Sequence, residues 1–214
     1  MRLQESKYYH IYHRGVKGDN IFYHDTDYQR FLEKYFYYLY IAADTYAYCL
    51  IHNHFHILIR VRPEEEQKKL FDKYQEEMIV SQNLTPAHHN VEYPHFKKYC
   101  ASNQLGHFLN SYTRYLNTTT GRTGVIFDGR FKRIEIDSIK YLSHLICYVH
   151  RNPIHHHLCR EYCSYKFSSY NTLFSDEKTM LNQTEALRVL GGVSNAEAAH
   201  EELRMDYISK YILE

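Results

Sequence analysis

The chain has 214 residues, of which 44% are hydrophobic and 16% aromatic, so it can build a core domain with a small appendage and is not a disordered or fibrous chain. The sequence contains no apolar run of the roughly 20 residues that cross a bilayer and begins without an apolar signal core, so we expect a cytoplasmic protein with no membrane contact. The formal net charge of +1 excludes an argument for nucleic-acid binding from bulk charge.

The first part of the chain predicts a strand, a helix and a β-hairpin. Alternating or helical spacing of apolar residues identifies these elements. They are a strand over 8–14, a helix over 25–43, and strands over 46–51 and 54–61. His52 and Asn53 form the short junction between the hairpin strands. After Pro63 ends the hairpin, the charged residues 64–79 predict a solvated helix, and residues 81–94 predict a loop.

The second part predicts helices around one extended segment. The predicted elements are a helix over 95–117, a turn over 118–124, an extended segment over 125–136 that bends at Asp128–Gly129, and helices over 138–151, 183–191 and 195–211. Asp137 or Ser138 caps the helix that starts there, and Pro153 stops it, because the residue before a proline disfavours helical backbone. This order predicts an α+β fold, an antiparallel sheet with helices packed on it in a ferredoxin-like arrangement, over residues 1–175, followed by a helical C-terminal extension over 176–214.

Two histidines in HNHFHILI lie two residues apart on a predicted strand. Residues two apart share a face, so His54 and His56 point the same way while Phe55, Ile57 and Ile59 point into the core. Two imidazoles on one rigid strand can bind one divalent cation. The alternative is a half-buried strand with chance histidines, which the 16 histidines of the chain make common.

A helix further along the chain carries a second group of candidate residues. Tyr148 and Asn152 have i, i+4 spacing and share a helix face, with Tyr141 and His144 near it. A phenol can attack a phosphodiester when a metal ion polarises the phosphate, and an amide oxygen can be a further metal ligand. The alternative is that Tyr148, one of 23 tyrosines, packs on the sheet and that Asn152 caps the helix end.

The five cysteines form no CxxC pair, and their number is odd. Without a secretory segment, we expect reduced thiols. Cys159 and Cys163 follow a His-rich turn at 155–157, so either a structural zinc site or two packed thiols after a basic turn accounts for them.

Six segments occur together in this chain: YYHIYHRG, NIFYHDTDYQRFL, AYCLIHNHFHILI, GRFKRIEID, YLSHLICYVHRNPI and FSSY. In this combination and order, the chain resembles the single-tyrosine transposases of the HUH endonuclease superfamily, most closely the REP-associated tyrosine transposases, over about residues 8–175. One difference is His52, where such proteins often have proline. The resemblance does not account for residues 64–94 and covers the tail after about 175 weakly.

The resemblance implies a metal site and a reaction. His54 and His56 correspond to the metal-binding pair, Asn152 to the third ligand and Tyr148 to the nucleophile. The implied cofactor is a divalent ion, Mn²⁺ on ligand chemistry or Mg²⁺ on availability, with no organic cofactor. Tyr148 would attack single-stranded or hairpin DNA, leaving a 5′-phosphotyrosine and a 3′-hydroxyl that can rejoin the strand without ATP.

A basic segment predicts local DNA contacts. Residues 95–133 carry seven basic side chains against Asp128 alone, a local charge of +6. Aromatic residues lie between them, so phosphate contacts can combine with base stacking; the alternative is a solvated helix face. The predicted contacts are Lys97, Lys98, Arg114, Arg122, Arg130, Lys132 and Arg133.

Other functions share parts of this pattern. A rolling-circle initiator or relaxase has the histidine pair but usually a second nucleophilic tyrosine, a helicase or a longer chain. A domesticated binding module would keep the fold without cleaving DNA. A zinc hydrolase needs a carboxylate beside the metal, and HNHFH contains none. The chain itself can act as a monomer or as a homodimer.

Overall fold

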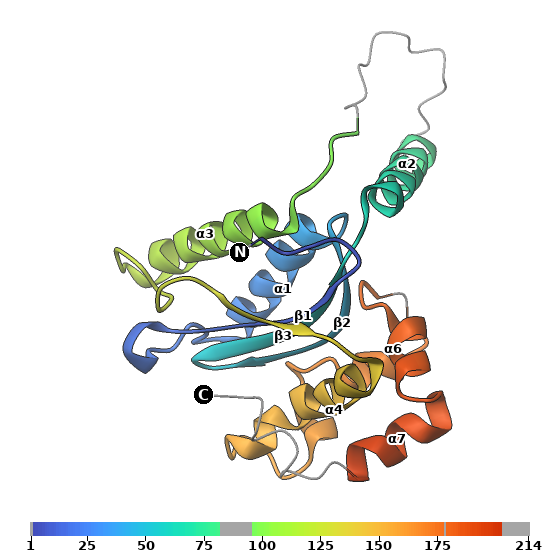
Figure 1. Ribbon diagram of the computed structural model, residues 1–214. Helices are drawn as coiled ribbons and strands as arrows, with labels where there is room; N and C mark the ends of the chain where they lie inside the picture. Colours follow the sequence, from blue (N-terminus) through green and yellow to red (C-terminus); the bar gives the residue numbers. More distant parts are fainter. Residues whose placement is uncertain (1, 82–95, 178, 203–214) are drawn as a thin grey trace, which may run out of the picture.

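The computed structural model describes residues 2–81, 96–177 and 179–202. Its centre is an antiparallel four-stranded sheet with the order β2-β3-β1-β4 (Figure 1). The sheet and its two crossover helices are β1 (Tyr8–Arg14), α1 (Asp25–Leu39), β2 (Ala43–Ile51), β3 (His54–Val61), α3 (Ala101–Thr120) and β4 (Lys132–Ile136). This βαββαβ order is ferredoxin-like, so the predicted α+β fold is confirmed.

Helices cover both faces of the sheet (Figure 1). On one face, α1 and α3 contact each other and bury a cluster of aromatic rings. In this cluster the ring centroid of Phe31 lies 5.0 Å from that of Phe55 and 4.8 Å from that of Phe108. On the other face, α4 (Ile139–His155) contacts β2, β3 and β4. The sheet is therefore the middle layer, with the predicted nucleophile helix on the side opposite the ring cluster.

The elements from β1 to β3 match their predicted bounds except between α1 and β2. The strands over 8–14 and 54–61 have the predicted bounds, whereas β2 begins at Ala43 and α1 ends at Leu39. Every residue of β2 is buried, so the strand shows no alternation of polar and apolar residues from which its first residues could be recognised.

The central segment differs more from the prediction. α2 (Glu64–Ser81) is helical as expected, and residues 82–94 of the predicted loop lie outside the described residues. α3 begins at Ala101 rather than 95 and continues to Thr120, where Gly121 takes the left-handed conformation (φ 66°) that favours glycine after a helix. Lys132–Ile136 of the predicted extended segment forms a strand with β1, and outside that strand Asp128 donates a backbone hydrogen bond to Arg14 at the end of β1.

α4 is longer than predicted. Ser138 is its N-cap, accepting a hydrogen bond from the backbone N–H of Tyr141. The expectation that Pro153 stops the helix is wrong, because α4 continues to His155. Pro153 lies in the last turn, where its missing N–H removes a single helical hydrogen bond, and the carbonyl of Asn152 still accepts from the N–H of His156.

The remaining described elements are short. They are the 3₁₀ turns Val16–Gly18 and Tyr162–Ser164, and the helices α5 (Tyr170–Leu173), α6 (Gln183–Val189) and α7 (Val193–Glu202). Both α6 and α7 contact α4, and residues 203–211 of the last predicted helix lie outside the described residues. No helix in the described ranges is long and apolar enough to cross a membrane. The division into 1–175 and 176–214 stays a prediction.

Candidate active site between β3 and α4

The histidine pair lies on the face of β3 that α4 covers. The ring centroids of His54 and His56 are 5.2 Å apart. On the opposite face of the strand, Phe55 is fully buried in the ring cluster. β1 fixes the register, because Arg14 pairs with His54 and Tyr12 with His56. The strand thus presents both imidazoles from a rigid, well-packed support.

α4 brings Asn152 and Tyr148 to these histidines. Asn152 Oδ1 lies 3.4 Å from His54 Nε2, and the Tyr148 ring lies 6.0 Å from the His56 ring and nearly perpendicular to it. Asn152 is fully buried and Tyr148 is 4% exposed. Tyr141 lies two turns earlier on α4, about 10 Å along the helix axis. The four residues predicted for the site therefore meet at one place, and their roles stay predictions.

Burial keeps both imidazoles neutral. It lowers the pKa of His54 to about 4, and the nearby His156 adds to this shift. It also lowers the pKa of His56 well below its usual value, with contributions from His10 and His54. A neutral imidazole at pH 7 keeps a lone pair for a metal ion. His56 Nε2 is buried with no hydrogen-bond partner among the described residues, as expected of a nitrogen that binds a metal.

The donor atoms fit a divalent cation. Two ligands at right angles about one ion, each about 2.1 Å from it, lie about 3 Å apart, close to the 3.4 Å between His54 Nε2 and Asn152 Oδ1. Two neutral imidazoles and an amide oxygen suit Mn²⁺ better than Mg²⁺.

The alternative of a structural zinc site at Cys159 and Cys163 has no support in the described residues. In residues 2–81, 96–177 and 179–202, no three His, Cys, Asp or Glu side chains gather as a metal site, so the two cysteines have no assembled ligand set there.

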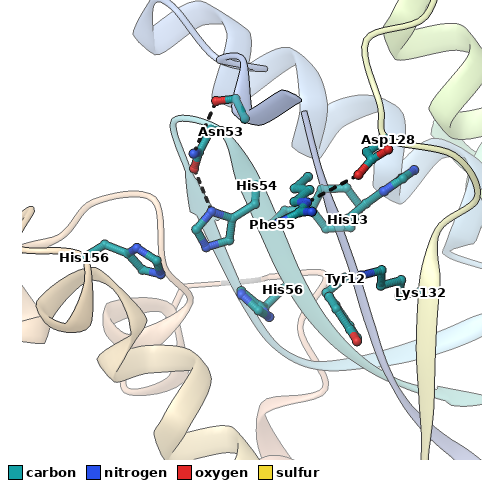
Figure 2. A pocket seen from close by; sticks show the side chains of 11 residues that line it. Tyr12, His13, Asn53, His54, Phe55, His56, Asp128, Lys132 and His156 are labelled. Atoms are coloured by element: carbon teal, nitrogen blue, oxygen red, sulfur yellow. Dashed lines mark hydrogen bonds and ion pairs between the residues drawn. The ribbon is translucent and has the colours of Figure 1, made fainter. Parts of the chain in front are cut away.

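A cavity of about 200 Å³ lies beside the histidine pair (Figure 2). The pair and His156 line one side, and Tyr12 and Lys132 line the other. Arg14 also lines the cavity and forms a 3.5 Å ion pair with Asp128. The cavity is large enough for part of a nucleotide, and its cationic side chains suit a phosphate.

Only part of the predicted basic segment lies near this cavity. Lys132 lines it, and the exposed Arg130 is two residues away in the chain. Arg133 points to the other face of β4, where its guanidinium lies 5.9 Å over the Phe131 ring. Arg122 is held by an ion pair with the Asp19 carboxylate, at 3.0 Å.

The remaining predicted contacts lie elsewhere. Lys98 forms an ion pair with Glu64, just past the end of β3 that is remote from His54; an eight-residue strand spans roughly 24 Å. Lys97 precedes it, and Arg114 belongs to α3 on the other face of the sheet. The seven basic residues therefore do not form one surface around the histidines.

Two side chains that lie within hydrogen-bonding distance of the histidine pair were not predicted as site residues. His10 Nε2 on β1 lies 2.9 Å from His56 Nδ1, and Asn53 Oδ1 lies 2.7 Å from His54 Nδ1. Alternation along β1 places His10 and Tyr12 on one face, but only the pairing of β1 with β3 brings His10 beside His56. The sequence therefore shows which face of β1 carries His10, but not that His10 lies beside His56.

Comparison with known proteins agrees with this architecture. No protein-family model and no curated protein matches the sequence. Among solved structures, a REP-associated tyrosine transposase bound to a REP hairpin matches with a TM-score of 0.55 and 12% sequence identity, over 82% of this chain and 83% of that chain. The two chains share one fold. At this identity the likeness concerns the fold alone, and it confirms at that level the resemblance to REP-associated tyrosine transposases drawn from the motifs.

Proposed function

We propose that this protein is a metal-dependent DNA endonuclease and strand transferase that acts on single-stranded or hairpin DNA. The observation that carries the proposal is the meeting of His54, His56, Asn152 and Tyr148, which come from two elements nearly a hundred residues apart. The shared fold with a transposase that is bound to a REP hairpin supports the same class of substrate.

Each residue has a defined task in this reaction. His54, His56 and Asn152 would hold a divalent ion, which when bound withdraws charge from the scissile phosphate. The Tyr148 oxygen attacks phosphorus, the bond to the 3′ oxygen breaks, and the phenolic proton is transferred in net to that oxygen. The products are a 5′-phosphotyrosine and a 3′-hydroxyl, and attack by a 3′-hydroxyl reverses the step and joins strands. Because a free phenol has a pKa of about 10, Tyr148 must lose its proton as it attacks.

The first prediction tests the nucleophile. Hairpin DNA with single-stranded flanks, incubated with the protein and Mn²⁺, should give a covalent protein–DNA adduct on a denaturing gel. Tyr148→Phe should abolish the adduct while binding to the hairpin persists, because only the hydroxyl is removed. Tyr141→Phe is the matched control on the same helix and should retain the adduct. Loss of the adduct in Tyr141→Phe but not in Tyr148→Phe would reassign the nucleophile.

A hairpin-binding protein that no longer cleaves is the second candidate. The 4% exposure of Tyr148 favours it, because an enclosed phenol must become accessible before it can attack. The same assay separates the two functions: hairpin binding without any wild-type adduct, in Mn²⁺ or Mg²⁺, supports the non-cleaving protein. A preference for a plasmid-type nicking site over hairpins would instead favour a rolling-circle or relaxase activity.

A further inference from the structure

Both candidate ligand histidines have a hydrogen-bond partner at Nδ1: Asn53 Oδ1 for His54 and His10 Nε2 for His56. We propose that Asn53 and His10 are positioning residues that hold His54 and His56 in the tautomer with the proton on Nδ1, so that both Nε2 atoms are free to bind metal. The inference rests on the proposed function only through the metal site that the two share, and it assigns roles to residues outside the predicted ligand set.

The case for Asn53 follows from donor and acceptor chemistry. An amide oxygen only accepts hydrogen bonds, so the 2.7 Å contact between Asn53 Oδ1 and His54 Nδ1 requires a proton on Nδ1 (Figure 2). A neutral imidazole has one N–H, which leaves His54 Nε2 with a lone pair. That lone pair faces Asn152 Oδ1 at 3.4 Å, and two acceptors this close together are favourable only with a cation or a hydrogen-bond donor between them.

The case for His10 follows from where the ring protons of His10 and His56 sit. Each neutral imidazole carries one N–H, on either Nδ1 or Nε2. His10 Nε2 and His56 Nδ1 are 2.9 Å apart, so one of these nitrogens donates to the other. If His10 donates, the proton of His56 must sit on Nε2, which is buried without a partner among the described residues, and the nitrogen is lost as a ligand. If His56 donates from Nδ1, its Nε2 is free for metal and the proton of His10 sits on Nδ1.

The second arrangement leaves the N–H at His10 Nδ1 without a partner. His10 is fully buried, and its Nδ1 has no hydrogen-bond partner in the described part of the chain. A buried donor without a partner is unfavourable by about 1–3 kcal/mol, so a role in packing alone does not explain a histidine at this position. Metal binding by His56 Nε2 would offset that cost, because ligand histidines are oriented by the acceptor on their other nitrogen.

Another buried histidine shows what a purely structural arrangement looks like. His150 is fully buried on α4, and both of its nitrogens are bonded: Nδ1 to His200 Nε2 at 2.8 Å and Nε2 to Ser169 Oγ at 2.7 Å. It matches His10 in burial and in having a histidine partner, but its two nitrogens are both satisfied. His150 is therefore the matched control.

The experiment measures Mn²⁺ affinity by EPR in the absence of DNA. His10→Met removes the acceptor at similar volume and should weaken Mn²⁺ binding about 10- to 100-fold. His10→Gln keeps an acceptor and should bind Mn²⁺ close to wild type. His150→Met should lower the urea midpoint without changing Mn²⁺ affinity. Asn53→Ala, at the partly exposed hairpin, should also weaken Mn²⁺ binding, and Asn53→Asp should restore it, so the test does not depend on a core variant that folds poorly.

The outcomes separate this inference from the proposed function. If wild type forms the adduct with Mn²⁺ but His10→Met and Asn53→Ala bind Mn²⁺ as wild type does, the positioning roles are wrong and the proposed function stands. If His10→Gln is as weak as His10→Met, the hydrogen bond is not the cause and the role of His10 is wrong. If wild type binds no Mn²⁺ and forms no adduct, both are wrong. Nitrogen NMR adds a direct readout, because finding the proton of His56 on Nε2 in the Mn²⁺-competent protein overturns the assignment.

Discussion

At the scale of single residues, one face of β3 packs in the core and the other lines the cavity. Phe55 supports the core, whereas His54 is partly exposed and contacts the cavity. His54→Ala should therefore reduce adduct formation by at least about 100-fold while the urea midpoint changes little, because a metal ligand stabilises charge in the transition state rather than the core. The measurements are adduct yield and urea unfolding on the same preparations.

His13→Phe is the control for that substitution. His13 also lines the cavity, but its ring stacks on Phe127 at 4.8 Å on the opposite face of the sheet. An aromatic replacement keeps that packing, so adduct formation should continue. Equal loss in both variants, or a collapse of stability in His54→Ala without a specific loss of activity, would favour a structural role for the histidine pair.

Those parts of the site that depend on a short sequence pattern could be predicted from the sequence. Strand alternation placed His54 and His56 together, and helical spacing placed Tyr148 and Asn152 together, because each relation depends on local backbone geometry. That the two pairs meet was implied only by the family resemblance. His10 escaped prediction because its position depends on how β1 pairs with β3, which no local pattern contains.

At the scale of elements, a buried polar network ties α4 to the sheet. Ser169 Oγ accepts the N–H of Tyr48 at 2.8 Å and lies 2.7 Å from His150 Nε2 on α4. Ser169→Ala leaves both groups without that partner, so the free energy of unfolding should fall by about 2–4 kcal/mol. Ser164→Ala is the matched control, because its exposed hydroxyl donates to the Glu161 carbonyl at 2.7 Å and should cost less than about 1 kcal/mol. Equal effects in urea unfolding would show that the network does not stabilise the fold.

Element boundaries were harder to predict than element types. Pro153 is a reliable helix breaker in an interior turn, but near a C-terminus it removes only one hydrogen bond, so α4 extends past it. The predicted extended segment over 125–136 contains both a bend and the short β4, because apolar spacing does not show which residues find a partner strand. These errors moved ends of elements without changing the order that defines the fold.

At the scale of the whole molecule, basic residues of the one predicted segment 95–133 lie at opposite ends of the sheet. Lys132→Ala should weaken hairpin binding and reduce the dependence of log affinity on log salt by about one phosphate contact, because Lys132 lines the cavity. Lys97→Ala removes the same charge beside the remote end of β3 and should leave both quantities near wild type. Fluorescence anisotropy over a salt series gives the comparison, and equal losses would mean that DNA covers the full length of the sheet.

Buried histidines also make the stability of the whole molecule depend on pH. Burial lowers the pKa of His10 to about 3 and of His13 and His54 to about 4, and it lowers the pKa of His56 and His150 well below the usual value. Because an unfolded histidine has a pKa near 6.5, the unfolded chain takes up protons below that pH while the folded chain does not. Each such histidine therefore lowers the free energy of unfolding by up to about 1.4 kcal/mol per pH unit between pH 6.5 and about 4.

Several histidines acting together should cause acid unfolding well above the usual range for carboxylates, since total stabilities are about 5–15 kcal/mol. Urea midpoints should be nearly constant from pH 8 to 7 and fall steeply from pH 6.5 to 5. His13→Phe removes one proton uptake without removing the ring stack, so its midpoint should fall less steeply over the same range. A wild-type midpoint that is unchanged between pH 7 and 5 would show that these rings are protonated in the folded protein, and that the histidine pair is not held neutral for a metal ion.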